Sequence, residues 1–518
     1  MKKTILTICL LTAIVYVAGQ SLLAPTSQVF YHRFEPKPFY PVPDVDPDPD
    51  PDPDTVSEPV NPYRRLYFVH GLGGNGSSWS RVPDACMNEN LHINGFPART
   101  CKVSTPDYDE ATGSTLYFAA NNIFDKIQST NRTDYFTGID PNRAILIGHS
   151  QGGVLCRTII HNDLVSTAPR PKYGNDYGGF ISVASSLKGA KILNNRDHII
   201  TMASDACSML AVGPIAERKL INAIFKIFLG SDYVRVGCET VTTTLLPVFF
   251  QKYYANITND YLDGAAWLNT LDRDINDQRY RSMPKIAIYC VEPQDNIFWR
   301  TMEWLINDPN QVEHFEANKD LEFYKSTIMP MMSKYYVGYT RALNEWAALQ
   351  SASYKNCVGL KYIWEMQVAV ANDKKNSWYQ GILWFNTVNS QWQNIIGALQ
   401  YEQQTKIVYD CYKCESGMAF RGTNQYTCYQ WNCKDMTPRA VHEYKWVLKE
   451  NDGIVTKESA SYLPCASVQP IQVWRNAVEN NIDKGTSHMQ VRNDEGIKKV
   501  LKLVFDGYYG DFFYTQTK

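Results

Sequence analysis

The sequence lacks several features that mark other classes of protein. Its 518 residues carry a formal net charge of only −2, and no stripe of lysine and arginine is present. Nucleic-acid binding needs such a stripe to neutralise phosphates, so the composition argues against that partner. Beyond the first 19 residues no stretch is long and apolar enough to cross a bilayer, and we find no internal repeat. We therefore expect the mature chain to be a soluble globular protein.

The first 19 residues resemble a secretory signal. Lys2 and Lys3 supply a positive start, Ile5 to Val17 form a short apolar run, and the segment ends in small residues at Ala18 and Gly19. The run is short for a membrane-spanning helix, which favours a cleaved signal peptide over a retained anchor. We expect an exported protein, secreted or periplasmic.

Twelve cysteines remain after this segment. An even number in an exported chain predicts disulfides. Cys411, Cys414, Cys428 and Cys433 form a cluster whose first pair has the spacing of a zinc knuckle, so zinc is the alternative there. Cys156 is expected to be a small core residue.

The composition changes several times along the chain. Residues 20–63 contain repeated Pro-Asp pairs that cannot bury apolar area, and they are interpreted as an extended linker. The remaining divisions follow the predicted strands and helices: a first core segment at 64–295 with a helical lid or cap at 195–275, an aromatic-rich helical insertion with the four cysteines at 296–440, and a second core segment at 441–518.

Short apolar strands alternate with helical patterns in the core segments. The strands are expected near 65–69, 98–106, 143–147, 180–184 and 285–291, and the helices near 114–129, 154–160 and 495–505. This alternation predicts an α/β fold with a mainly parallel sheet covered by helices on both faces. Within the insertion, helical patterns run from about 317 to 400.

The motif Gly148-His149-Ser150-Gln151-Gly152 carries the chemistry. Gly-x-Ser-x-Gly between an apolar strand and a helix predicts a nucleophile elbow, in which a strained turn exposes the serine hydroxyl. The motif alone occurs by chance, but here a strand precedes it and a helix follows. Ser150 is therefore the predicted nucleophile.

A second glycine-rich loop, His70-Gly71-Leu72-Gly73-Gly74, follows the first strand. A tetrahedral intermediate needs two donors aimed at its oxyanion. We expect these to be the backbone N–H groups of Leu72 and Gln151.

With these motifs the chain resembles the lipases of the α/β-hydrolase superfamily, particularly bacterial secreted triacylglycerol lipases. The resemblance rests on His70-Gly71-Leu72, on residues 148–153, and on Asn451-Asp-Gly-Ile-Val455. Tyr261 to Asn269 also resembles the stretch that follows the lid in those enzymes. The resemblance as a whole covers residues 64–295 and 441–510 and leaves the insertion unmatched.

The resemblance implies the order serine, acid, histidine. Of the nine histidines only His488 lies beyond Asp452, so His488 is the expected base and Asp452 the expected acid. Asp295, after a predicted strand end, is the alternative acid, and Asn-Asp-Gly at 451–453 is also an ordinary turn sequence. His149 is expected to be structural.

Two departures from those lipases limit what carries over. Residues 184–189 lack their Pro-His strand end, and Gln490 stands where an aspartate usually binds calcium. We therefore predict no metal and no cofactor.

The sequence thus predicts a secreted serine hydrolase that cleaves carboxylic esters, with lipids as substrates and transient contact with a lipid interface. The alternatives are an esterase or depolymerase for polyesters or acylated glycans, and a binding protein that retains the fold without activity. The natural substrate and the oligomeric state are not predicted.

Overall fold

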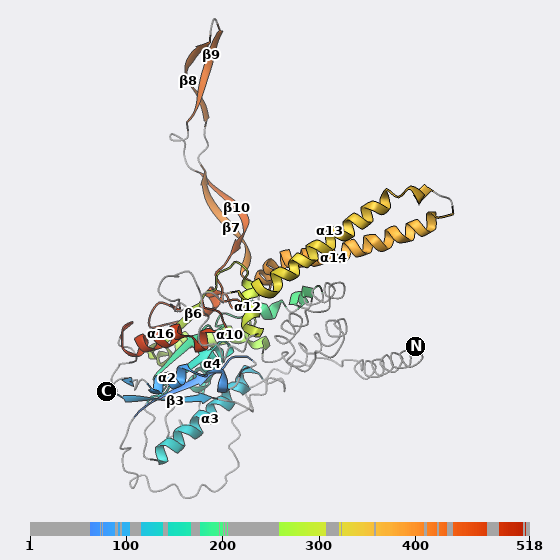
Figure 1. Ribbon diagram of the computed structural model, residues 1–518. Helices are drawn as coiled ribbons and strands as arrows, with labels where there is room; N and C mark the ends of the chain where they lie inside the picture. The colour runs from blue at the N-terminus through green and yellow to red at the C-terminus, as the bar shows by residue number, and fades with distance from the viewer. Residues whose placement is uncertain are drawn as a thin grey trace, which may run out of the picture. The chain divides into compact units, whose positions relative to one another are not determined.

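The structure is a computed structural model (Figure 1). It describes residues 63–306 except 73, 75, 89–91, 94–95, 104–114, 138–142, 167–176, 196, 200, 203–204 and 206–257; residues 321–473 except 323, 357–358, 409–411, 422–423 and 433–438; and residues 486–513 except 511–512. The predicted signal peptide and nearly all of the predicted linker lie outside these ranges. Tyr63, assigned to the linker, is buried next to the first strand.

A seven-stranded sheet forms the centre of the chain, in the order β11-β6-β5-β4-β1-β3-β2. Its strands are β1 (Arg64–Val69), β2 (His92–Ile93), β3 (Phe96–Val103), β4 (Ile145–His149), β5 (Gly179–Val183), β6 (Lys285–Cys290) and β11 (Ile471–Val473). All neighbouring pairs are parallel except β2 with β3. The predicted parallel sheet is therefore confirmed.

Both faces of this sheet are buried, which explains why its strands are continuously apolar. In β1, Tyr67 and Val69 belong to one hydrophobic cluster, while Leu66 and Phe68 belong to another on the opposite face. The first cluster is closed by helices α3 (Leu116–Phe136), α4 (Gln151–Val165) and α10 (Ala266–Asp272), and the second by α2 (Val82–Asn88) and α16 (Glu495–Phe505).

Short helices complete the core. These are α5 (Lys191–Asn194), α11 (Gln278–Ser282) and α15 (Lys457–Ala460), with 3-10 turns at Gly76–Ser78, Thr258–Tyr261, Arg273–Asn276 and Val491–Asn493. Most of the predicted lid lies outside the described residues. Its last part, residues 258–275, packs into the core: Tyr261, Leu268 and Leu271 are buried in the cluster that contains α4.

Aromatic and aliphatic residues of the insertion form a second hydrophobic core, which also includes Ile199 and Met202 of the predicted lid. The insertion comprises α12 (Ile297–Ile306), a π-helical turn (Tyr324–Ile328), α13 (Met329–Gln350), a 3-10 turn (Ser353–Asn356) and α14 (Lys361–Ile395). Phe298 and Trp299 of α12 pack against Trp384, Phe385 and Trp392 of α14. Six aromatic side chains are buried in this cluster.

The insertion also contains strands that the sequence did not predict. Strands β7 (Leu399–Val408) and β10 (Arg439–Leu448) form an antiparallel pair, and β8 (Tyr412–Arg421) pairs with β9 (Asn424–Asn432). The second core segment was placed from residue 441 onward, and this boundary needs correction. Residues 441–448 pair with β7 and not with the central sheet, because their apolar residues alternate with charged ones instead of forming a continuous apolar run.

The structure describes some of the cysteines for which disulfides were predicted. Cys156, Cys290 and Cys465 carry no disulfide, and Cys156 is buried in α4 as expected of a core residue. Cys411 and Cys433 lie outside the described residues, so a disulfide or zinc site in their cluster stays a prediction. Among the helices that the structure describes, none is long and apolar enough to cross a membrane.

Candidate active site

The turn between β4 and α4 holds Ser150 in a strained backbone conformation. Its φ of 55° and ψ of −127° lie where non-glycine residues are rare. Glycines make the turn fit: a Cβ on Gly148 would lie 2.4 Å from the Gly152 carbonyl oxygen, and one on Gly152 would lie 2.4 Å from the His70 carbonyl oxygen. The predicted elbow is thus present, with Ser150 at the amino end of α4.

The loop after β1 lies directly against this turn. A Cβ on Gly71 would come within 2.7 Å of the Ser150 Cβ and 3.3 Å of its Oγ. His70, which is buried, donates through Nδ1 to the Gly71 carbonyl at 2.8 Å, and the Gly74 N–H donates to the same carbonyl at 3.1 Å. Burial lowers the pKa of His70. These bonds fix the loop so that Leu72, the next residue, follows a glycine packed on Ser150.

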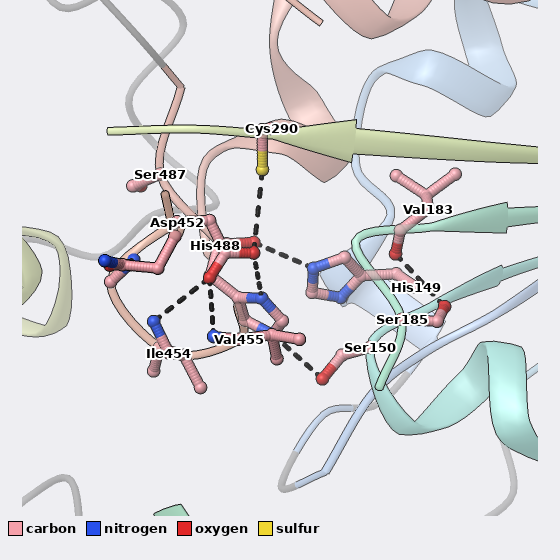
Figure 2. A network of polar contacts seen from close by, with 12 residues as sticks. His149, Ser150, Val183, Ser185, Cys290, Asp452, Ile454, Val455, Ser487 and His488 are labelled. Carbon is pink, nitrogen blue, oxygen red and sulfur yellow. Dashed lines mark hydrogen bonds and ion pairs between the residues drawn. The ribbon is translucent and has the colours of Figure 1, made fainter. Parts of the chain in front are cut away.

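Figure 2 shows Ser150, His488 and Asp452 in one hydrogen-bonded chain. The distance from Ser150 Oγ to His488 Nε2 is 2.8 Å, and that from His488 Nδ1 to Asp452 Oδ2 is also 2.8 Å. The three residues come from three places in the sequence. Ser150 follows β4, Asp452 follows β10, and His488 precedes α16. This geometry allows the imidazole to accept the serine proton while the carboxylate orients it.

A tight turn at residues 451–455 holds the Asp452 carboxylate. Its Oδ1 accepts the backbone N–H groups of Ile454 at 3.0 Å and Val455 at 2.7 Å. Its own backbone carbonyl accepts the His488 N–H at 3.0 Å. Asn-Asp-Gly at 451–453 is therefore both an ordinary turn and the source of the acid, because the backbone N–H groups of the turn orient the Asp452 side chain.

The thiol of Cys290, at the end of β6, donates to Oδ2, the same carboxylate oxygen that His488 contacts. Its Sγ lies 3.7 Å from Asp452 Oδ2, and both side chains are buried. Burial raises the pKa of the Cys290 thiol well above its ordinary value, which keeps the proton on sulfur and the thiol a donor. Reasoning from sequence missed Cys290, since nothing in the chain order links it to Asp452.

Asp295, the alternative acid, is not part of this arrangement. Its side chain is 73% exposed, and its ion-pair partner is Arg300 at 3.8 Å. It lies after β6, where the fold commonly carries its acid, but the carboxylate that reaches His488 comes from the 451–455 turn.

His149 contacts both the backbone and the ring of His488. Its Nε2 donates to the His488 backbone carbonyl at 2.8 Å, and its ring packs 4.9 Å from the His488 ring. Complete burial lowers the pKa of His149 well below its ordinary value, with the neighbouring His488 adding to the effect. A neutral His149 fits the structural role expected for it.

The two expected oxyanion donors, Leu72 and Gln151, belong to the two segments that contact or adjoin Ser150. Gln151 is the first residue of α4, a position whose N–H group has no acceptor within the helix. Leu72 follows Gly71, which touches Ser150 from the β1 loop. The two loops thus bring both backbone N–H groups to the neighbourhood of the serine, together with the positive end of the α4 dipole.

Sheet order, strand direction and the strained serine turn define this chain as having the α/β-hydrolase fold. No protein-family model and no characterised protein sequence matches it. Solved structures that align with it include phospholipase PlaB from Legionella pneumophila (14% identity, TM-score 0.27, 45% of this chain and 39% of that one).

Two further matches are an extracellular alpha/beta-hydrolase from a Paenibacillus species (15% identity, TM-score 0.24, 44% of this chain and 77% of that one) and carboxyl esterase 2 from Tuber melanosporum (15% identity, TM-score 0.22, 46% and 60%). This chain spans about two fifths of the length of PlaB. Because the identities and TM-scores are this low, the fold is assigned from the strand order of this chain and from its Ser150 turn.

Proposed function

We propose that this protein is an exported serine hydrolase that cleaves carboxylic esters, with lipids as its substrates. The observation that carries the proposal is the chain from Ser150 Oγ through His488 to the buried Asp452, with 2.8 Å at both links. An ordered acid, base and nucleophile of this kind is the arrangement that activates a serine hydroxyl.

The reaction would proceed in two halves. Ser150 Oγ attacks the ester carbonyl carbon while His488 Nε2 takes the serine proton, and the N–H groups of Leu72 and Gln151 stabilise the oxyanion. The intermediate collapses to acyl-Ser150, and His488 passes its proton to the departing alcohol. Water then attacks the acyl group with His488 again as base, which releases the carboxylic acid and restores Ser150.

The lipid part of the proposal is supported by the resemblance of the glycine loops and the 451–455 turn to secreted triacylglycerol lipases. Export is supported by the character of residues 1–19. Neither residues 1–19 nor most of the predicted lid at 195–275 are among the described residues.

The test is labelling of the purified protein with a fluorophosphonate, compared with Ser150→Ala. We expect labelling of the wild type only, and loss of ester hydrolysis in the variant with an unchanged thermal unfolding midpoint. Substantial hydrolysis by folded Ser150→Ala would refute the assignment of the nucleophile. A folded wild type that stays unlabelled both with and without detergent would instead favour a binding protein that retains the fold.

Acyl-chain profiling then separates lipids from other esters. We expect hydrolysis of p-nitrophenyl esters to extend to long acyl chains when these are presented in detergent micelles. Activity confined to acetyl and butyryl esters would favour the alternative, an enzyme for acylated glycans or short polyesters.

A further inference from the structure

The ribbon formed by β7 and β10 has two chemically different faces. Because side chains alternate along a strand and Leu399 is paired with Leu448, the register assigns every residue to a face. One face, called here the aromatic face, contains Leu399, Tyr401, Gln403, Thr405, Ile407, Ala440, His442, Tyr444, Trp446 and Leu448. The opposite face contains Gln400, Glu402, Gln404, Lys406, Val408, Arg439, Val441, Glu443, Lys445 and Val447.

Aspartate, glutamate, lysine and arginine are thus absent from the aromatic face of this described ribbon and gather on the other one. At the centre of the aromatic face, Tyr401 stacks on Tyr444 with a centroid distance of 5.6 Å and lies 5.2 Å from the Trp446 ring. These three side chains are 59%, 58% and 61% exposed, and Ile407 is 63% exposed. The ribbon therefore presents its apolar side to solvent, the reverse of a strand that packs on a core.

The polar atoms on this face are partly satisfied within it. Thr405 Oγ1 and His442 Nδ1, which face each other across the ribbon, form a 3.0 Å hydrogen bond. The backbone groups between the two strands pair along the full ten-residue register. These bonds reduce the number of hydrogen bonds to water that the face loses when it meets a less polar medium.

The base of the ribbon adjoins the candidate active site. Lys449, directly after β10, donates its backbone N–H to the buried Ala398 at 2.7 Å, and Asp452 follows three residues later. The Trp392 indole N–H donates to the Gly453 carbonyl at 2.8 Å, which ties α14 to the turn that holds the acid. The ribbon is thereby connected through a few buried residues to the turn that holds Asp452.

We propose that the aromatic face of the β7–β10 ribbon is a docking surface for a lipid–water interface, which holds the enzyme on its substrate phase. Separation of apolar from charged side chains onto two faces is the property that lets an element lie in the plane of such an interface. Tyrosine and tryptophan prefer this boundary because their rings are apolar and their polar atoms stay hydrated.

Other partners fit the face less well. Because it contains no aspartate, glutamate, lysine or arginine, it offers little to a charged polymer. The aliphatic side chains of Leu399, Ile407 and Leu448 extend the apolar surface beyond what stacking on sugar rings uses. A zwitterionic lipid surface has no net charge, which matches a face without aspartate, glutamate, lysine or arginine. This inference builds on the proposed ester hydrolysis of lipids but concerns binding, so the two are tested separately.

The experiment measures flotation of the full chain with phosphatidylcholine vesicles in a Ser150→Ala background, where no lipid is hydrolysed. The test variant adds Tyr401→Ser, Tyr444→Ser and Trp446→Ser, and a second carries Trp446→Gln alone. The matched control adds Glu443→Gln and Lys445→Gln on the opposite face of β10, which leaves the net charge unchanged.

We expect the triple variant to lose at least about tenfold in vesicle partitioning, since three half-exposed aromatic side chains no longer leave water, and Trp446→Gln to lose less. The control should partition like the parent. With Ser150 restored, the triple variant should hydrolyse a soluble butyryl ester at the wild-type rate but vesicle-borne esters at least about tenfold more slowly than the wild type.

Three results would overturn the docking surface: no partitioning of the parent, equal partitioning of the parent and both aromatic-face variants, or a change from dimer to monomer caused by the aromatic substitutions in gel filtration. The last result would assign the face to a second copy of the chain. Parent partitioning together with absent Ser150-dependent hydrolysis would retain the surface and refute the proposed function instead.

Discussion

The turn that holds Asp452 and the ribbon that precedes it differ in how they treat their side chains. Asp452 is buried and accepts hydrogen bonds from Ile454, Val455, His488 and Cys290. Four residues earlier, at Leu448, the chain leaves a ribbon whose aromatic side chains are mostly exposed. A reacting group must be held by fixed donors, whereas a surface that meets a fluid partner needs area and no fixed donors.

The largest expected effect compares the two aspartates that flank the insertion. Asp452→Asn should lower kcat for a soluble ester by about 10⁴-fold, because the amide no longer fixes the His488 tautomer or stabilises its cation. Asp295→Asn should change kcat little, since that side chain is exposed and away from His488. Steady-state kinetics on both purified variants checks this, and a severe loss only in Asp295→Asn would reverse the assignment of the acid.

A second comparison sets a core glycine against one in the insertion. Gly152→Ala should cost more than about 3 kcal/mol in the free energy of unfolding, because the new Cβ meets two backbone oxygens of β1 and its loop at 2.4 and 2.5 Å. Gly359, before α14, has nothing within 4 Å of a built Cβ, so Gly359→Ala should lie within about 1 kcal/mol of wild type. Urea denaturation measures both, and equal losses would contradict the packing described for the elbow.

The third prediction concerns pH and the buried His149. Because burial depresses its pKa in the folded state, the unfolded chain takes up the proton first as pH falls below 6.5. The stability that neutral His149 contributes is therefore present above pH 6.5 and is lost as pH falls toward the depressed folded pKa. Between pH 6 and 5 the wild type should lose up to about 1.4 kcal/mol per pH unit more than His149→Gln. Parallel slopes for the two proteins in denaturation experiments at stepped pH would show that His149 is not held neutral.

The smallest expected effect separates two buried cysteines. Cys290→Ala should lower kcat by no more than about fivefold, since a thiol is a weak donor and Asp452 keeps its three stronger bonds. Cys156→Ala, in the α4 core, should reduce stability without changing kcat. Determining kcat and the unfolding midpoint for each checks this, and an unchanged kcat in Cys290→Ala would remove the thiol from the site.

The sequence predicted the core well because its signals are local. The strand ending at His149, the glycines around Ser150 and the helix that follows are contiguous, so the elbow could be recognised from one short segment. The apolar strands were recognisable because both sheet faces are buried. The ribbon of β7 and β10 was not recognised, since an exposed ribbon in an insertion has neither a continuous apolar run nor a core to face.

The choice between Asp452 and Asp295 shows the other limit. Both aspartates follow strands and both have turn residues beside them, so the order of the chain left two acids open. The structure decides between them because only Asp452 lies within hydrogen-bonding distance of His488. The 451–455 turn and the segment that carries His488 meet at the end of β6, where the Thr486 N–H donates to the Val291 carbonyl at 3.1 Å.

By itself the sequence determined the α/β alternation, the serine turn and the candidate base, because strand burial, glycine spacing and chain order are properties of neighbouring residues. Only the tertiary structure decided which carboxylate meets His488, that Cys290 joins it, and that the aromatic residues divide between a buried cluster around Trp392 and an exposed ribbon face. Those outcomes depend on contacts between segments that are distant in the sequence, 36 residues apart for Asp452 and His488 and 162 for Cys290 and Asp452, and on what surrounds each side chain. A local pattern does not contain this information.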